Sequence, residues 1–150
     1  MSSDGSDAAN TASDLSPGPH DVVLPEGWPR PSGYANAISA RGRSVFVAGQ
    51  IGWDPRTYVM VSNDFAEQTH AALENVIAIL RAAGASPVHV VRMTWYITDL
   101  TAYLAALKEV GQSFRVLFGG HYPAMSVVQV NALLEPRARV EIETTAVVPD

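Results

Sequence analysis

Apolar and polar positions alternate along some segments of the chain and recur at helical spacing along others. Alternation and β-branched content predict four strands. These strands are expected at residues 44–51, 89–98, 124–131 and 139–148. One helix is predicted to start at the capping sequence Asp64-Phe65-Ala66-Glu67 and to end at Gly84. A second is predicted between Asp99, which can cap it, and the pair Gly119-Gly120.

The order of these elements predicts an α+β fold, with a mixed β-sheet and two helices packed on one face. The other face of the sheet is then exposed. The predicted strands carry more apolar surface than one helical layer should cover, which predicts a homo-oligomer. The apolar residues behind this expectation are Val45, Val47, Trp95, Ile97, Val128, Val130, Val140 and Ile142.

The first 21 residues differ in composition from the rest of the chain. They are rich in Ser, Asp, Gly, Ala and Pro, and Leu15 is their only large aliphatic residue after Met1. Such a segment buries too little to offset its ordering entropy. We therefore expect a disordered tail at 1–21 and a single domain at 22–150, since a chain of this length forms a sizeable core by itself.

Composition excludes several classes of function. The chain has no cysteine, which excludes disulfides, thiolate metal sites and a cysteine nucleophile. Its net charge of −5, with scattered arginines, argues against nucleic-acid binding. No apolar run reaches the roughly 20 residues of a membrane span, and no secretory signal pattern is present. These features fit a cytoplasmic protein that does not bind membranes.

The usual metal, cofactor and nucleophile motifs are not found. The four histidines lack partners at ligand spacing, and there is no phosphate-binding glycine loop, so neither a metal site nor a cofactor is expected. Ser126 is interpreted as a small strand residue rather than a nucleophile. His121 precedes a predicted strand, and a loop role is favoured over a role in a site.

Two glutamates are the main candidates for chemistry. Glu141 and Glu143 lie on one side of the last predicted strand, with apolar residues on the other. The structural interpretation is a solvated strand face. The functional one is a carboxylate that faces a pocket as a general base or a group that positions water.

Seven short segments, in order and at matching distances, give the chain a clear resemblance to the RidA (YjgF-type) family. Gly33-Tyr34-Ala35-Asn36-Ala37 resembles the family's GPYSQA, and the segment from Val45 to Ile51 resembles its VFVSGQI. The segment from Gln68 to Asn75 resembles its QTRQALENL. The later landmarks are Ile97-Thr98-Asp99, Tyr122-Pro123-Ala124, Gln129-Val130 and Val140-Glu141-Ile142-Glu143. The match spans about Gly33 to Val148.

The resemblance implies a chorismate-mutase-like fold and a homotrimer with small-molecule clefts between subunits. The best-known members hydrolyse enamines and imines without a cofactor. By resemblance, Glu141 orients or activates water, Tyr34 lines the cleft and Gly49 is a backbone position that approaches the ligand. Met125 stands where the family has a carboxylate-binding arginine. Its neighbours Ala124 and Val127 are counted with it as substrate-binding residues.

Met125 changes the expected substrate. Arginine binds a carboxylate through a bidentate, charge-assisted fork, whereas methionine offers no donor. Either another cation, among Arg30, Arg56 and Arg92, replaces the lost one, or the substrate lacks the carboxylate. The leading hypothesis is a hydrolase or deaminase acting on an enamine or imine (C=N) bond, with a substrate that is not an α-imino acid.

The alternative is a non-catalytic small-ligand-binding or chaperone-like trimer. A third interpretation, a ribonuclease or translation inhibitor, follows the label of some family members. The net charge and the lack of a basic stripe argue against it.

Overall fold

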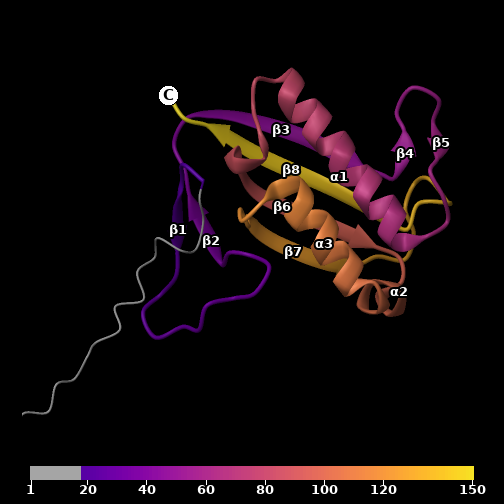
Figure 1. The fold of residues 1–150 in the computed structure, drawn as a ribbon, viewed down its shortest axis with the longest axis horizontal. Helices are drawn as coiled ribbons and strands as arrows, with labels where there is room; N and C mark the ends of the chain where they lie inside the picture. The colour runs from indigo at the N-terminus through magenta and orange to yellow at the C-terminus, as the bar shows by residue number, and fades with distance from the viewer. Residues whose placement is uncertain (1–17) are drawn as a thin grey trace, which may run out of the picture.

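A four-stranded sheet with helices on one side forms the centre of the molecule (Figure 1). The computed structural model describes residues 18–150. The strands are β1 (Asp21–Val23), β2 (Ala37–Ser39), β3 (Arg43–Gln50), β4 (Trp53–Asp54), β5 (Val59–Met60), β6 (Val90–Ile97), β7 (Ala124–Gln129) and β8 (Val140–Val148). The helices are α1 (Phe65–Ala82), α2 (Leu100–Ala105) and α3 (Leu107–Phe118), with a short 3-10 helix, η2 (Pro87–His89).

The central sheet has the strand order β3-β8-β6-β7 and mixed direction. β8 is antiparallel to both β3 and β6, whereas β6 and β7 are parallel. A parallel pair needs a crossover, and α2 with α3 provides it. The pairs β1-β2 and β4-β5 form two small separate sheets, and in Figure 1 they lie at opposite ends of the central one. The predicted α+β class, with a mixed sheet and helices on one face, is thus confirmed.

The helices bury one face of the sheet more completely than the sequence suggested. Trp95, Ile97, Val140 and Ile142 are each at most 1% exposed, on the face that α1 and α3 cover. Val47 is also buried there. The expectation that one helical layer cannot cover this surface was therefore wrong for these five residues, because alternation places them on the side that the helices cover.

The opposite face of the sheet is open and chemically mixed. Phe46 is 80% exposed and Val128 43% exposed. Tyr96 donates a hydrogen bond from its hydroxyl to Glu143 Oε1 at 2.7 Å, and this bond is the first cause of the raised pKa of Tyr96. Apolar surface therefore remains on this face. It includes Val128, which the sequence predicted, and Phe46, which it did not.

The caps of α1 agree with the sequence at both ends. Asp64 Oδ2 accepts the backbone N–H of Glu67 at 3.0 Å, as predicted for the N-cap. The backbone N–H of Asp64 donates to Ser62 Oγ at 3.0 Å. Ser62 therefore takes the place that the Glu67 side chain has in a capping box. The helix ends at Ala82, and Gly84 follows with a φ of +73°, which a glycine adopts without strain.

The second predicted helix is two helices. α2 and α3 meet at Ala106, whose ψ of 5° lies outside the helical region. Neither glycine nor proline marks this break, so the residue pattern carries no signal for it. As predicted, Asp99 caps the start, accepting from Ala102 N at 3.1 Å, and Gly119 follows the end.

Within residues 18–150, the first strand begins at Asp21, one residue before the predicted domain boundary. His20 Nε2 lies 2.6 Å from the carbonyl oxygen of Val147, which links this point to the last strand. Residues 1–17 of the predicted tail lie outside the described residues. No helix in the described part is long and apolar enough to cross a membrane.

Candidate functional site

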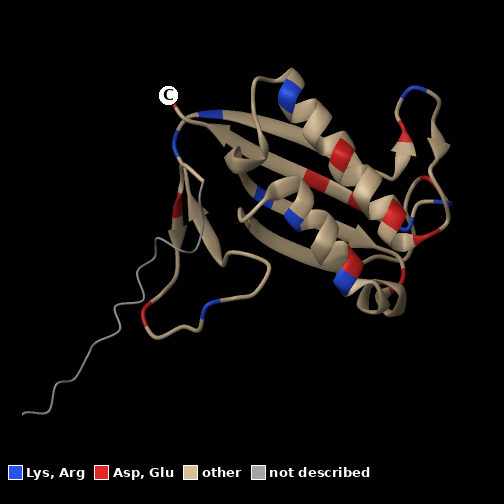
Figure 2. Cartoon of the chain, viewed as in Figure 1, with Lys and Arg blue, Asp and Glu red and all other residues tan. Residues whose placement is uncertain are grey.

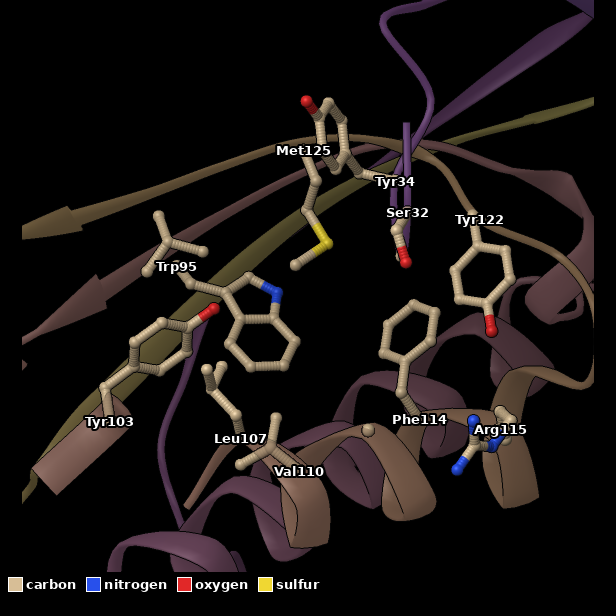
Figure 3. Close-up of a pocket in the computed structure, with 13 residues that line it drawn as sticks. Ser32, Tyr34, Trp95, Tyr103, Leu107, Val110, Phe114, Arg115, Tyr122 and Met125 are labelled. Carbon is tan, nitrogen blue, oxygen red and sulfur yellow. The ribbon is translucent and has the colours of Figure 1, made fainter. Parts of the chain in front are cut away.

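A cavity of about 610 Å³ lies between α3 and the β6-β7 edge of the sheet (Figure 3). Its floor is the helix-facing side of the strands and its wall is one face of α3. The loop that carries Ser32, Gly33 and Tyr34 borders it on a third side. The backbone N–H of Ala35 binds the carbonyl oxygen of Pro123 at 3.0 Å and so fixes this loop beside the start of β7.

The register of β6 and β7 decides which side chains enter this cavity. Met125 pairs with Met93, and Val127 pairs with Trp95. Paired residues point to the same face, and Met93 and Trp95 are buried under the helices. Met125 and Val127 therefore also face the helices, and both line the cavity.

Aromatic rings form much of the wall. The ring of Phe114 stacks on that of Tyr122 with centroids 5.8 Å apart and an interplanar angle of 12°. The ring of Phe114 also stacks on that of Phe118, with centroids 4.4 Å apart and an interplanar angle of 8°. The indole of Trp95 is tilted to Phe114 at 6.3 Å. The wall is thus a pre-formed set of flat apolar surfaces, which is typical of small-molecule sites.

The polar side chains of the lining are four hydroxyl-bearing residues, Ser32, Tyr34, Tyr103 and Tyr122, together with the indole of Trp95 and the guanidinium of Arg115. Tyr103 is a lining residue, and burial raises the pKa of its hydroxyl, which keeps it a neutral donor. The guanidinium of Arg115 stands at the solvent side, on an exposed residue. Among residues 18–150, no carboxylate and no histidine belongs to the lining. This cavity can bind and orient a small molecule, but it holds no general base of its own.

The predicted acid lies on the other face of the sheet. Glu141 pairs with Tyr96, and the side chains of this row point away from the helices. Gly49 lies beside it: a Cβ built on Gly49 would be 2.7 Å from Glu141 Cδ and 2.8 Å from Cγ. The absent side chain of Gly49 thus leaves the space that the Glu141 carboxylate occupies. The pairing of β3 and β8 shifts register between Val47 and Gln50, next to this contact.

The six predicted site residues therefore fall into two groups. Tyr34, Met125 and Val127 meet at the cavity, whereas Gly49 and Glu141 meet on the open face. Ala124, one residue before Met125, does not line the cavity, because alternation turns it to the other side of β7. Alternation within each strand does not tell which faces of two strands share a side of the sheet. The strand pairing was needed to show that Met125 and Glu141 lie on opposite faces.

None of the three cations considered from the sequence lines the cavity. Arg92 lies on the open face beside Phe46 and Glu143, and Arg56 is exposed in the β4-β5 hairpin. Arg30 borders a neighbouring depression with Tyr34.

Arg115 is the cation that the sequence reasoning missed. It shares one face of α3 with Gly111 and Phe114, at the i, i+3 and i+4 spacing of a helix. That spacing was the available signal.

The histidines serve structural contacts. His121 is 1% exposed, and its Nε2 lies 2.6 Å from the carbonyl oxygen of Val90. Burial lowers its pKa. His70 joins α1 to α3 through Ser113 Oγ at 2.9 Å. Among residues 18–150 no cluster of histidines and acids is arranged to hold a metal ion.

The protein is thus an α+β domain with a largely aromatic cavity between α3 and the β6-β7 edge of the sheet. The sequence matches the family described as Endoribonuclease L-PSP over residues 29–148. The chain therefore belongs to this family, which is the YjgF/RidA family.

Individual relatives are similar along most of their length. A RutC family protein of Pyrococcus horikoshii is 39% identical, over 84% of this chain and 96% of that protein. The human 2-iminobutanoate/2-iminopropanoate deaminase is 34% identical, over 76% of this chain and 79% of the relative. The crystal structure of the Rid family protein YyfB of Yersinia pestis superposes with a TM-score of 0.76 at 32% identity, covering 86% of this chain and 98% of that one.

Proposed function

We propose that this protein hydrolyses an enamine or imine bond of a small, mostly apolar molecule. The observation that carries the proposal is the cavity that Met125 borders, in a chain whose relatives include imine deaminases. Water adds to the carbon of the C=N bond, the C–N bond then breaks, and ammonia or an amine leaves with a carbonyl product.

Met125 sets the proposed selectivity. Its thioether projects into the cavity in Figure 3 and adds apolar surface where a cation would be needed to hold a carboxylate. Burying a carboxylate without a partner costs several kcal/mol, by order of magnitude. Arg115 lines the same cavity from α3, but its guanidinium stands apart from Met125 in Figure 3. The proposed substrate is therefore not an α-imino acid.

Glu141 is proposed to orient the water. It lies against Gly49 on the open face of the sheet. A single chain places it on the far face of the sheet from the cavity. Catalysis by both groups therefore requires a second subunit, and we propose a homotrimer in which clefts between subunits bring one chain's cavity beside another chain's Glu141.

The first test compares Glu141→Gln with Glu143→Gln. Both acids lie on the same face of β8, but only Glu143 is bound to Tyr96. Ammonia release from an imine generated in place should be abolished by Glu141→Gln and retained by Glu143→Gln, while circular dichroism shows both variants folded. Full activity in Glu141→Gln would remove the proposed role.

A mixing experiment tests the shared site. Gly111 lies in α3 on the cavity wall, with nothing within 4 Å of an added Cβ, so Gly111→Trp should fill the cavity without disturbing the core. Each of Glu141→Gln and Gly111→Trp should be inactive alone. After subunit exchange, mixed oligomers should recover activity, since some clefts then combine an intact cavity with an intact glutamate. No recovery, with exchange verified by mass, would place both groups in one subunit.

A non-catalytic ligand-binding role is the second candidate. The observation that favours it is that the cavity lining contains no carboxylate and no histidine. Under this alternative the Glu141→Gln variant binds ligands as the unmodified protein does, and neither releases ammonia from any imine offered.

An RNA-cleaving function is not proposed. The arginines and the one lysine, Lys108, are scattered among acids over the described part of the chain, and they form no stripe (Figure 2). With a net charge of −5, the protein lacks the basic surface that neutralises phosphates.

A further inference from the structure

We propose that the indole N–H of Trp95 is the hydrogen-bond donor that selects the ligand, and that the ligand is an uncharged planar molecule bearing a carbonyl group. This inference rests on the proposed function, because it names the substrate class of the same cavity. It concerns a residue that the family resemblance does not assign.

The first observation is an unsatisfied buried donor. Trp95 is 1% exposed, and its Nε1 has no hydrogen-bond partner among the described residues. Figure 3 shows this nitrogen on the side of the ring that faces the thioether of Met125, away from Leu107 and Val110 of α3. A buried N–H left unpaired costs free energy, and an acceptor in the cavity would recover that cost.

The position of Trp95 separates it from the other unpaired group. Thr144 Oγ1 is also buried without a partner, but Thr144 pairs with Met93 and Val47 in the middle of the sheet and does not line the cavity. Of the two unpaired buried side-chain atoms in the described part, only Trp95 Nε1 belongs to a residue that lines this cavity. The nitrogen is covered in this structure, so a ligand reaches it when the neighbouring thioether of Met125 moves aside.

Charge and shape define the rest of the ligand. The cavity lining contains no carboxylate to hold a cation, and its one guanidinium, that of Arg115, stands on an exposed residue at the solvent side. The nearly parallel rings of Phe114 and Tyr122 offer a flat wall for stacking. A neutral planar molecule fits these surfaces, and a carbonyl oxygen supplies the acceptor that Trp95 lacks.

Three probes of similar size test the inference on the unmodified protein. Acetophenone has the ring and the carbonyl, ethylbenzene has the ring without an acceptor, and benzoate has the ring with a charge. We expect acetophenone to bind about tenfold more tightly than ethylbenzene, since a site with a buried donor rejects the analogue that leaves it unpaired. Benzoate should bind more weakly than acetophenone. Titrations followed by NMR of protein labelled with ¹⁵N-tryptophan give these affinities.

The same spectra identify the donor. The chain has three tryptophans, so three indole signals are expected. Acetophenone should move the signal of Trp95 downfield and leave those of Trp28 and Trp53 in place. Trp95→Phe keeps a ring in the core and removes the donor, so the preference for acetophenone over ethylbenzene should disappear. Trp53→Phe, outside the cavity, should preserve it.

Several results would overturn the inference. They are equal affinities of acetophenone and ethylbenzene, tightest binding of benzoate, no binding of acetophenone up to its solubility, and an unmoved Trp95 signal at saturation. The probe series on the unmodified protein decides the question even if Trp95→Phe fails to fold. None of the probes has a C=N bond, so these outcomes are independent of whether the protein hydrolyses imines.

Discussion

Replacing Gly49 by alanine should lower the activity of this protein while leaving its stability nearly unchanged. A Cβ at Gly49 would lie 2.7 Å from Cδ and 2.8 Å from Cγ of Glu141, and a contact with Oε1 would be closer still. Ordinary van der Waals contacts of a Cβ begin at about 3.4 Å. The carboxylate must therefore retreat when the methyl group is added.

The size of the effect follows from that retreat. Misplacing a catalytic group by about 1 Å can lower the rate about 10²-fold, so kcat for imine hydrolysis should fall by about that factor. The free energy of unfolding should change by less than about 1 kcal/mol, because the displaced atoms belong to a flexible side chain and alanine suits a strand better than glycine.

Two controls sharpen the assay. Gly52→Ala places its Cβ 2.5 Å from the Cα of Gln68, a backbone atom that cannot yield, so this variant should lose stability by roughly 1–3 kcal/mol. Glu141→Gln combined with Gly49→Ala should be no slower than Glu141→Gln alone, since both changes act on one group. Ammonia release and urea unfolding are measured on all variants. Unchanged kcat in Gly49→Ala, or additive losses in the double variant, would refute the reasoning.

The other predictions concern the cavity and a buried histidine. Met125→Arg should tighten the binding of a 2-keto acid such as pyruvate by about tenfold to a hundredfold, through charge-assisted hydrogen bonds, and Met125→Leu should not; calorimetric titration compares the two. Burial lowers the pKa of His121, so below about pH 6.5 the unfolded state binds more protons than the folded state and stability is lost as the pH falls. His121→Gln keeps an N–H donor for Val90 and should flatten the pH dependence of urea unfolding between pH 7 and 5; an equally steep dependence would place its origin elsewhere.

Sequence periodicity determined most of the fold because burial acts on one face of each element. The alternation in 139–148 placed Val140, Ile142 and Thr144 on one side and the two glutamates on the other, and the structure has this arrangement. The helix caps at Asp64 and Asp99 were also readable, since capping is a local hydrogen bond. The break at Ala106 was not, because no local residue demands it.

The site depended on long-range pairing, which no local pattern contains. Tyr34, Gly49, Met125 and Glu141 were all named from the sequence, but the parallel register of β6 and β7 decided that Met125 faces the helices. The antiparallel register of β6 and β8 turned Glu141 to the opposite face.

The unpaired indole of Trp95 likewise became visible only in the folded chain. In sequence it is one more apolar strand residue. Whether its N–H finds a partner depends on the side chains that surround it from β7 and α3, which lie at least twelve residues away along the chain. The sequence by itself thus determined the elements and their buried faces, and the tertiary structure alone decided which faces meet around the cavity.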